Sequence, residues 1–344
     1  MSNATREIGF GIIGAGAVSP LHAAAISNCP GARLVAVADL SEERARKLAG
    51  DAASYADYRE MLARPDVDVV CVCVPSGMRL GVCVDAARAG KHILAEKPLE
   101  VTLERADAAI EACEAAGVKL AVIFQVRFMP GVQALRGAVE LGQLGKLVMG
   151  DAYVKWHRTQ EYYDSSDWRG TWEMDGGGVL MNQAIHHVDL LQWMMGPVES
   201  VFGRTATLVH ERIEVEDTAV ACFRFANGAL GTIAACTSAS KGVPARLEIR
   251  GETGTVILEE GKIALWDVEG VPQPEVESMD LGSGASDPSA ITSLGHQAQI
   301  NDLVQAINEN RPPVVDGREA RKAIEIIAGI YRSARDGAPV RLPL

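Results

Sequence analysis

Three consecutive glycines, Gly176–Gly178, open a stretch that otherwise has the pattern of a helix, "GGGVLMNQAIHHVDLLQW". Glycine starts a helix poorly, so this choice indicates that another group must approach the backbone there. Asn182 and His186 follow four residues apart, on one helical face, with Asp189 near the same stripe. A histidine, whose unperturbed pKa is ~6.5, can gain or lose a proton near neutral pH. The free amides at the helix start beside it could bind a hydroxyl or an anion.

Two alternatives remain open for these residues. His186 can be an ordinary hydrogen-bonded core histidine, and the glycines can serve only as a loop hinge. The neighbouring His187 lies about 100° around the helix, where it would pack in the core or meet solvent.

A second glycine pattern, "GFGIIGAGAVSPLHAAA", lies near the N-terminus. Gly14 and Gly16 follow an apolar strand and precede a helix, so a pyrophosphate could sit on the helix N-terminus; Ser19 takes the third fingerprint position. Asp39, at the end of the next strand, is placed to hold the adenosine ribose hydroxyls. Its charge would repel a 2′-phosphate, which favours NAD over NADP, although Arg44 opposes this. In the alternative, the glycines form only a tight turn and Asp39 caps a helix.

Composition excludes several classes of protein. The chain has 344 residues, 33 of them basic and 45 acidic, so there is no basic field for nucleic acid or an anionic membrane. No apolar run reaches the ~18 residues of a membrane span, and "MSNATRE" lacks the apolar core of a signal peptide. The seven cysteines form no CxxC pair and indicate reduced core residues. We expect a cytoplasmic globular protein.

The elements that must position these residues change in character along the chain. The first third alternates strands and helices, beginning with Ile8–Ile13, which predicts a parallel sheet. Beyond about Gln125, "TAVACFRF" and "ALGTIAACTSA" flank Asn227-Gly228, a strong hairpin signal, and further short strands follow. The fold class expected is α/β, with a Rossmann domain over 1–125 and a second domain over 126–344 built on an open, mainly antiparallel sheet. The last helices could pack back on the first domain.

Three stretches together resemble the Gfo/Idh/MocA oxidoreductase family. They are "GIIGAGAVSPLHAAAI", "VCVPSGMRLGVCVDAARAGKHILAEKPLEVT" and "GGGVLMNQAIHHVDLLQWMMG", and they span most of the chain. The most specific element is Glu96-Lys97-Pro98, followed at family spacing by the glycine-rich helix start and its histidine. Without this setting, the Glu-Lys-Pro element would be only a solvated charge pair before a turn.

The resemblance implies an NAD(P)-dependent dehydrogenase or reductase with a sugar, polyol or sugar-nucleotide substrate. Lys97 would lie near nicotinamide and substrate, the peptide before Pro98 is often cis, and His186 would be the acid/base; Lys97 would stabilise the developing oxyanion. Many relatives carry an acidic residue where this chain has Asn182, which cannot take a proton. The expected cofactor-binding residues are Gly14, Gly16, Ala17, Val18, Asp39, Pro75, Ser76, Glu96 and Lys97. The expected substrate-binding residues are Gln125, Arg127, Trp168, Arg169, Asn182 and His186.

The segment "AYVKWHRTQEYYDSSDWRGTWEMD" concentrates aromatic residues and arginines in a chain that is only 5% aromatic. Aromatic faces pack on sugar rings, and arginine offers a fork for carboxylate or phosphate. The alternative is that these rings form a subunit contact or cover a sheet edge. The resemblance also implies a homodimer or homotetramer formed through the open sheet face. His296 is a weaker site candidate, with a core or capping role as its alternative.

No metal site is expected, because the histidines and cysteines lack ligand spacing. A second class of function is also possible for this fold. It is a non-catalytic dinucleotide-binding sensor, and the presence of both Lys97 and His186 argues against it.

Overall fold

The computed structural model describes residues 6–277, 279 and 282–344. The N-terminal residues 1–5, where no signal peptide is expected, lie outside that range. The chain divides into two compact units, of which the first comprises Met1–Gln125 with Thr292–Arg321 and the second Val126–Ile291 with Lys322–Leu344. The cofactor motif therefore lies in the first unit and the glycine-rich helix start in the second.

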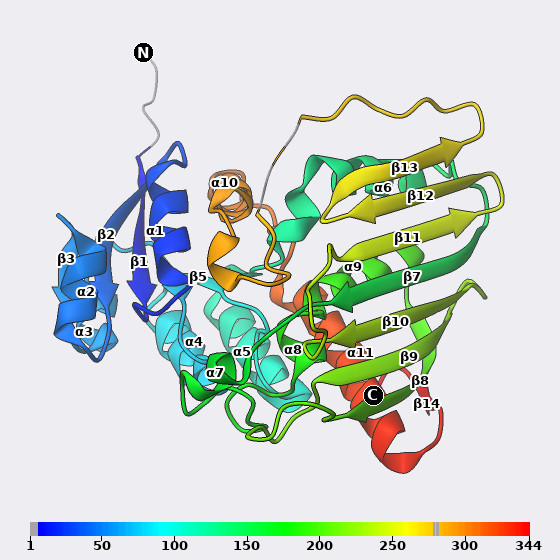
Figure 1. Cartoon of the computed structure of the whole chain (residues 1–344). Helices are drawn as coiled ribbons and strands as arrows, with labels where there is room; N and C mark the ends of the chain where they lie inside the picture. The colour runs from blue at the N-terminus through cyan, green and yellow to red at the C-terminus, as the bar shows by residue number, and fades with distance from the viewer. Residues whose placement is uncertain (1–5, 278, 280–281) are drawn as a thin grey trace. The chain divides into compact units, whose positions relative to one another are not determined.

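The first unit is built on a six-stranded parallel sheet in the order β3-β2-β1-β4-β5-β6. This is the strand order of dinucleotide-binding folds, in which ligands lie outside the carboxyl ends of the strands. Figure 1 labels β1, β2, β3 and β5 of this sheet. The alternation expected for the first third of the chain is confirmed. The strands are β1 (Ile8–Ile13), β2 (Ala32–Ala38), β3 (Ala53–Tyr55), β4 (Val69–Val72), β5 (His92–Ala95) and β6 (Leu120–Val122).

The helices of this unit include one from far along the chain. Helix α10 packs on α1, and its Ile300, Leu303 and Val304 belong to the same buried cluster as β1, β2 and β4. Gln299 of α10 also hydrogen-bonds to the backbone at the end of β6 and just after it. Its side chain accepts from the Phe124 amide at 2.9 Å and donates to the Val122 carbonyl. The helices are α1 (Ser19–Ser27), α2 (Glu42–Ala49), α3 (Tyr58–Leu62), α4 (Arg79–Arg88), α5 (Leu103–Ala116) and α10 (Leu294–Asn308), with a 3₁₀ turn η1 (Ser76–Met78).

The second unit is built on an eight-stranded sheet in the order β13-β12-β11-β7-β10-β9-β8-β14. All neighbours are antiparallel except β7 and β10. The expected hairpin at Asn227-Gly228 joins β9 to β10, with Gly228 at φ +88°. The strands are β7 (Leu147–Lys155), β8 (Val198–Ala206), β9 (Thr218–Phe225), β10 (Leu230–Cys236), β11 (Arg246–Gly251), β12 (Gly254–Glu259), β13 (Lys262–Val268) and β14 (Val340–Arg341).

One face of this sheet carries the helices that position the second half of the candidate site. Helix α9 packs on β7 and β11, and α8 packs on β9 and β10 (Figure 1). Side chains along β9 alternate between buried and exposed, so the other face of that strand is open. The remaining helices are α6 (Pro130–Glu140), α7 (Gln160–Asp164), α8 (Val179–Asn182), α9 (Ile185–Met195) and α11 (Gly317–Asp336), with 3₁₀ turns η2 (Gln125–Phe128) and η3 (Pro288–Ala290).

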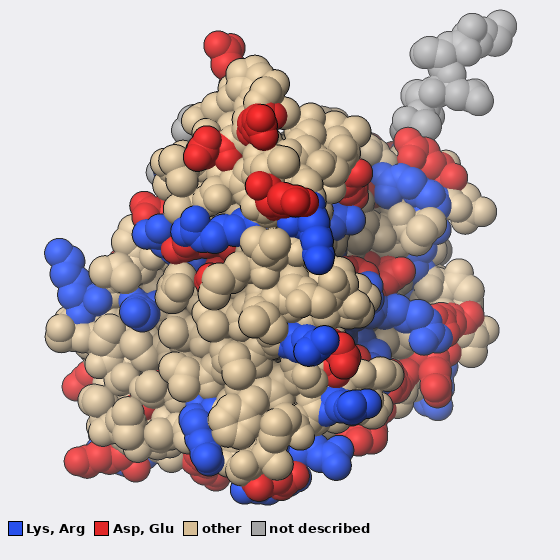
Figure 2. All heavy atoms as spheres, turned by 90° about the vertical axis from the view of Figure 1, so that its right-hand side faces the viewer, with Lys and Arg blue, Asp and Glu red and all other residues tan. Residues whose placement is uncertain are grey.

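The face of the molecule drawn in Figure 2 carries charges of both signs. Lys and Arg are interspersed there with Asp and Glu around a broad area of uncharged residues. Within the described ranges, no helix combines the length and the hydropathy needed to cross a bilayer. All seven cysteines are free, and five of them are buried.

Candidate active site

The loop after β1 has the geometry of a pyrophosphate cradle. A Cβ on Gly14, which has φ +94°, would lie 2.9 Å from the Cys73 carbonyl oxygen, so only glycine fits there. A Cβ on Gly16 would meet nothing within 4 Å, which leaves open space above that backbone. Ser19 donates its hydroxyl to the Gly14 carbonyl, which gives this non-glycine position a role in holding the turn. Helix α1 begins after Ala17 and Val18 without a side-chain cap, so its N-terminus suits an anion.

Asp39 lies directly after β2, where a ribose would be held. Its Oδ2 accepts the Ala15 amide at 2.7 Å, and its Oδ1 accepts the Ser41 amide at 2.8 Å. Arg44 donates to the same Oδ1 at 2.8 and 3.1 Å. Burial would raise the pKa of this carboxyl, but the two amides and Arg44 lower it overall. Arg44 is thus paired with Asp39, which supports the expected preference for NAD.

The ends of β4 and β5 supply the remaining cofactor candidates. Pro75 and Ser76 follow β4, and Glu96 and Lys97 follow β5, so all lie at the carboxyl edge of the parallel sheet. The Lys97–Pro98 peptide is cis, as the resemblance implies.

A buried arginine connects these two strand ends. Arg79, which is 6% exposed, donates to the carbonyl oxygen of Val74 at 3.1 Å and to that of Pro98. It therefore fixes the loop that carries Lys97 relative to the end of β4.

A cluster that the sequence did not predict surrounds Glu96. His22 Nε2 and His296 Nε2 lie 2.8 and 3.4 Å from Glu96 Oε1, and all three side chains are buried. The other carboxylate oxygen accepts the Lys97 amide at 3.1 Å. Burial would raise the pKa of Glu96, but the histidine hydrogen bonds hold it well below its usual value.

The cluster also has the composition of a metal-ligand set. The three ligand atoms lie within 4.8 Å of one another. A distance of 2.8 Å between Nε2 and Oε1 is that of a direct hydrogen bond, so hydrogen bonding accounts for the geometry. His296, expected only as a weaker candidate, therefore supports the residue next to Lys97.

The glycine-rich start is fixed by the second unit's own atoms. A Cβ on Gly178 would lie 1.7 Å from the Glu216 carbonyl oxygen, and one on Gly177 would lie 2.2 Å from the Tyr331 hydroxyl oxygen. The Glu216 carboxylate accepts the amides of Gly178 and Leu180 at 3.0 and 2.9 Å, and Tyr331 donates to it at 2.9 Å. Burial raises the pKa of Glu216 to about 7 against the opposing effect of these donors.

The single helix expected after the glycines is divided in the structure. Helix α8 ends at Asn182 and α9 begins at Ile185. Between them the Ala184 amide bonds to the Val179 carbonyl at 2.7 Å, five residues back, which inserts a π-type turn. The regular four-residue stacking assumed for Asn182 and His186 is therefore interrupted. Such turns occur frequently at functional sites.

The histidines and the amide lie in a buried setting within the second unit. His186 and His187 are 8% and 7% exposed, and burial lowers the pKa of His187 to about 4. The Asn182 amide donates to Asp175 Oδ1 at 3.0 Å, and Asp175 Oδ2 accepts the Gly170 amide at 3.0 Å. The buried Asp175, which the sequence did not single out, thus holds Asn182 by its amide group.

Arg127 and Gln125, both expected to bind substrate, differ in their hydrogen-bond partners. Arg127 is 1% exposed and forms a two-pronged ion pair with Asp189 at 2.5 and 2.6 Å, with its guanidinium over the ring of Trp193. It therefore has a structural partner in the core. Gln125 is 9% exposed, and its Oε1 is buried without a hydrogen-bond partner within the described residues. Both remain predictions as substrate-binding residues.

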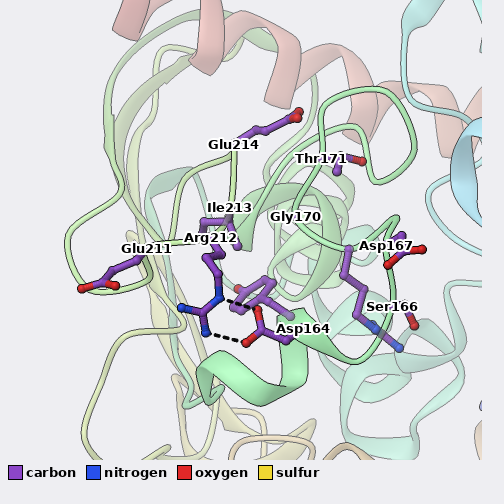
Figure 3. Close-up of a pocket in the computed structure, with 11 residues that line it drawn as sticks. Asp164, Ser166, Asp167, Gly170, Thr171, Glu211, Arg212, Ile213 and Glu214 are labelled. Atoms are coloured by element: carbon purple, nitrogen blue, oxygen red, sulfur yellow. Dashed lines mark hydrogen bonds and ion pairs between the residues drawn. The ribbon is translucent and has the colours of Figure 1, made fainter.

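The aromatic segment borders a cavity of about 450 Å³ that contains neither Asn182 nor His186. Its charged lining is mixed, with Arg169 and Arg212 among acidic side chains. Figure 3 shows Arg212 paired with Asp164 at 2.5 Å, while the carboxylates of Glu211 and Glu214 point away from that pair. The lining residues are Tyr163, Asp164, Ser166, Asp167, Arg169, Gly170, Thr171, Glu211, Arg212, Ile213 and Glu214.

Comparisons with known proteins identify the family. Residues 8–124 match the model described as "Oxidoreductase family, NAD-binding Rossmann fold", and residues 132–257 match that of the "GFO/IDH/MocA C-terminal domain". The chain belongs to the Gfo/Idh/MocA oxidoreductase family. As a member, it is an oxidoreductase with an NAD-binding Rossmann unit, which confirms the resemblance and the expected cofactor.

Three Gfo/Idh/MocA relatives are similar over nearly their whole length. An uncharacterized oxidoreductase, YrbE of Bacillus subtilis, is 31% identical, covering 98% of this chain and 97% of its own. The myo-inositol 2-dehydrogenase of Thermotoga maritima is 28% identical, covering 97% and 98%. The crystal structure of the WlbA dehydrogenase from Bordetella pertussis, in complex with NADH and UDP-GlcNAcA, is 36% identical, with a TM-score of 0.88 and coverage of 98% and 100%.

We expect Asp39→Ala to lower the preference for NADH over NADPH by about 10- to 100-fold, because it removes a charged acceptor and frees Arg44. Equilibrium binding of both reduced cofactors, followed by their fluorescence, measures this without a substrate. Asp57→Ala, which removes the helix-capping carboxylate of α3, is the matched control. If the ratio of the affinities for NADH and NADPH is unchanged in Asp39→Ala, Asp39 does not select the cofactor.

Glu216 predicts a pH dependence of stability. Its pKa is raised from 4.5 to about 7 in the folded state. The protonated carboxyl therefore contributes fully to the free energy of unfolding below pH 4.5, and this contribution is lost as the pH rises through about 7. The stability of the wild type relative to Glu216→Gln should therefore fall between pH 5 and 8, by at most about 3 kcal/mol. Thermal unfolding across this range tests it, with the exposed Glu104→Gln as control. A constant difference over the range would contradict the prediction.

Proposed function

We propose that this chain is an NAD-dependent dehydrogenase of a secondary alcohol on a sugar, a cyclic polyol or a sugar nucleotide, working in either direction. The observation that carries the proposal is the pair of anchored acid/base candidates. Lys97 follows a Glu96 fixed by two histidines, and His186 follows a glycine-rich start fixed by Glu216. A protein that only senses a dinucleotide needs neither side chain.

The two side chains divide the proton chemistry in this proposal. NAD⁺ supplies the acceptor for the hydride that leaves the carbinol carbon. A ring nitrogen of His186 accepts the hydroxyl proton, and the Lys97 ammonium donates a hydrogen bond to the same oxygen as its negative charge develops. The products are the ketone, NADH and one proton. Asn182, held by Asp175, cannot take a proton and is assigned to orientation or to a substrate hydroxyl.

Within this substrate range, the sugar nucleotides have the strongest support. The WlbA dehydrogenase, crystallised with UDP-GlcNAcA, is 36% identical to the chain, whereas the myo-inositol 2-dehydrogenase is 28% identical. A panel of cyclic polyols, free sugars and UDP-sugars with NAD⁺, followed by the absorbance of NADH, tests the proposal. Turnover of any cyclic alcohol supports it, and turnover of none on the panel would contradict it.

We also infer that the chain assembles as a homodimer or homotetramer through the open face of the second unit's sheet. Val220 of β9 and Leu230 of β10 are 51% and 57% exposed there, which leaves apolar surface uncovered. Light scattering in solution tests this inference, and a monomer would contradict it.

We expect Lys97→Met and His186→Ala to leave the affinity for NADH largely intact, because the cofactor candidates Gly14, Gly16 and Asp39 are unchanged. Each should lower kcat by about 10²- to 10⁴-fold. Because both act on one proton and its oxygen, the double variant should be little worse than the poorer single one. Steady-state rates and NADH binding measure the two effects.

His187→Asn is the matched control for this experiment, since it changes the neighbouring histidine and should retain most of the rate. Wild-type turnover by His186→Ala alongside an inactive Lys97→Met would show that His186 only packs. Thermal unfolding of each variant separates loss of catalysis from loss of fold.

A further inference from the structure

Two guanidinium groups share one aromatic ring in the segment that leads to the glycine-rich start. The Arg158 guanidinium lies 5.4 Å from the centre of the Tyr162 ring, and that of Arg169 lies 4.4 Å from the same centre. Arg158 also lies over Trp156 at 5.3 Å, and Arg169 lies over Trp168 at 4.7 Å. These contacts hold both positive charges in defined positions.

Neither arginine has a carboxylate partner among the residues that the structure describes. Arg158 is 6% exposed and donates to the carbonyl oxygens of His157 at 2.7 Å and Ala285 at 3.4 Å, and its side chain also hydrogen-bonds to that of Tyr162. Arg169 donates to the Tyr162 hydroxyl at 2.7 Å. The Nε atoms of both arginines are buried, and no described residue hydrogen-bonds to them. The buried Arg127, by contrast, is paired with Asp189.

No carboxylate in the described part of the chain forms an ion pair with Arg158 or Arg169. Burial lowers the pKa of Arg158, and the charge of Arg169 acts in the same direction. The charge of Arg158 contributes a little to lowering the pKa of the exposed Asp287 carboxyl. The two side chains nevertheless form no ion pair. Because a buried charge is ordinarily paired, an anion placed beside these two guanidinium groups would be stabilised by them.

The backbone around Arg158 is fixed before any ligand binds. Its amide donates to the Thr237 carbonyl at 2.9 Å, and His210 Nε2 lies 2.9 Å from its carbonyl oxygen. His210 is itself held by Asp217 at 3.0 Å. A rigid arginine fork of this kind binds an anion with little loss of conformational freedom.

Arg169 is also linked to Asn182, which belongs to the same unit. Gly170, next to Arg169, donates its amide to Asp175, and Asp175 accepts the amide group of Asn182. His186 follows four residues later. An anion held by the arginines would thus be set in a fixed relation to this part of the chain.

We propose that Arg158 and Arg169, arranged around Tyr162, form a subsite for an anionic group of the substrate, a carboxylate or a phosphate. The proposal rests on the proposed function and deepens it, because it selects acidic sugars and sugar nucleotides over neutral polyols. Arg169 also lines the cavity of mixed charge described above, whose other arginine, Arg212, is already paired with Asp164.

The test compares Arg158→Met and Arg169→Gln on three substrates. They are a UDP-linked uronic acid, the same UDP-sugar without the carboxylate, and myo-inositol. We expect kcat/KM to fall by about 10- to 100-fold for the anionic substrates, with less than about a 3-fold change for myo-inositol. A loss confined to the uronic acid assigns the subsite to carboxylate, and a loss on both UDP-sugars assigns it to phosphate.

Arg212→Met, which removes the same charge from a paired and exposed site, is the matched control and should match the wild type. Arg158→Lys keeps the charge without the fork, so it reports on the subsite if Arg158→Met folds poorly. Binding of NADH confirms the fold of every variant. Equal losses on neutral and anionic substrates, or no loss on the anionic ones, would overturn the subsite.

The subsite and the proposed function can fail separately. If the wild type oxidises nothing on the panel, the proposed function fails, and calorimetric binding of UDP and of glucuronate then decides the subsite. Binding of either compound to the wild type that weakens at least about 10-fold in both arginine variants supports the subsite. If the wild type binds neither compound, or if the wild type and the variants bind them equally well, the subsite is overturned.

Discussion

The second unit depends on one close approach between two backbone segments. The chain at Gly178 lies so near the Glu216 carbonyl that no side chain fits, and the Glu216 carboxylate accepts the amides of Gly178 and Leu180 at the start of α8. A buried acid therefore replaces the usual Ser, Thr or Asp cap from a distant part of the chain. The positions of α8 and of the turn leading into α9 follow from this contact. The glycines are thus explained by the protein's own packing, before any ligand is considered.

The sequence could predict much of the fold because its local signals agree with the global arrangement. The strand-helix alternation, the Asn227-Gly228 hairpin and the glycines after β1 each have a local physical cause, and the structure contains all three. The division between α8 and α9 was missed because the apolar pattern runs on through Ala184. The π-type bond that separates them has no compositional signal.

The supporting residues of the candidate site were the hardest to foresee. Glu216 stands in an acidic stretch that has the composition of a solvated loop, yet it is buried and accepts three hydrogen bonds. His296 meets Glu96 across 200 residues of sequence, and a lone histidine in a helix carries no sign of such a partner. Asp175 was missed for the same reason, because its partner is set by tertiary structure alone.

The place of α10 in the first unit has a consequence for how the protein is made. Ile300, Leu303 and Val304 of α10 cover the same core as β1, but the ribosome makes all of Val126–Ile291 before it reaches them. At roughly 5–20 residues per second, this interval is about 10–30 s. During that time the apolar face that α10 covers is exposed on the nascent dinucleotide-binding unit, and Glu96 lacks its contact with His296. Its folding is therefore completed late, although its first strand is made near the beginning of translation.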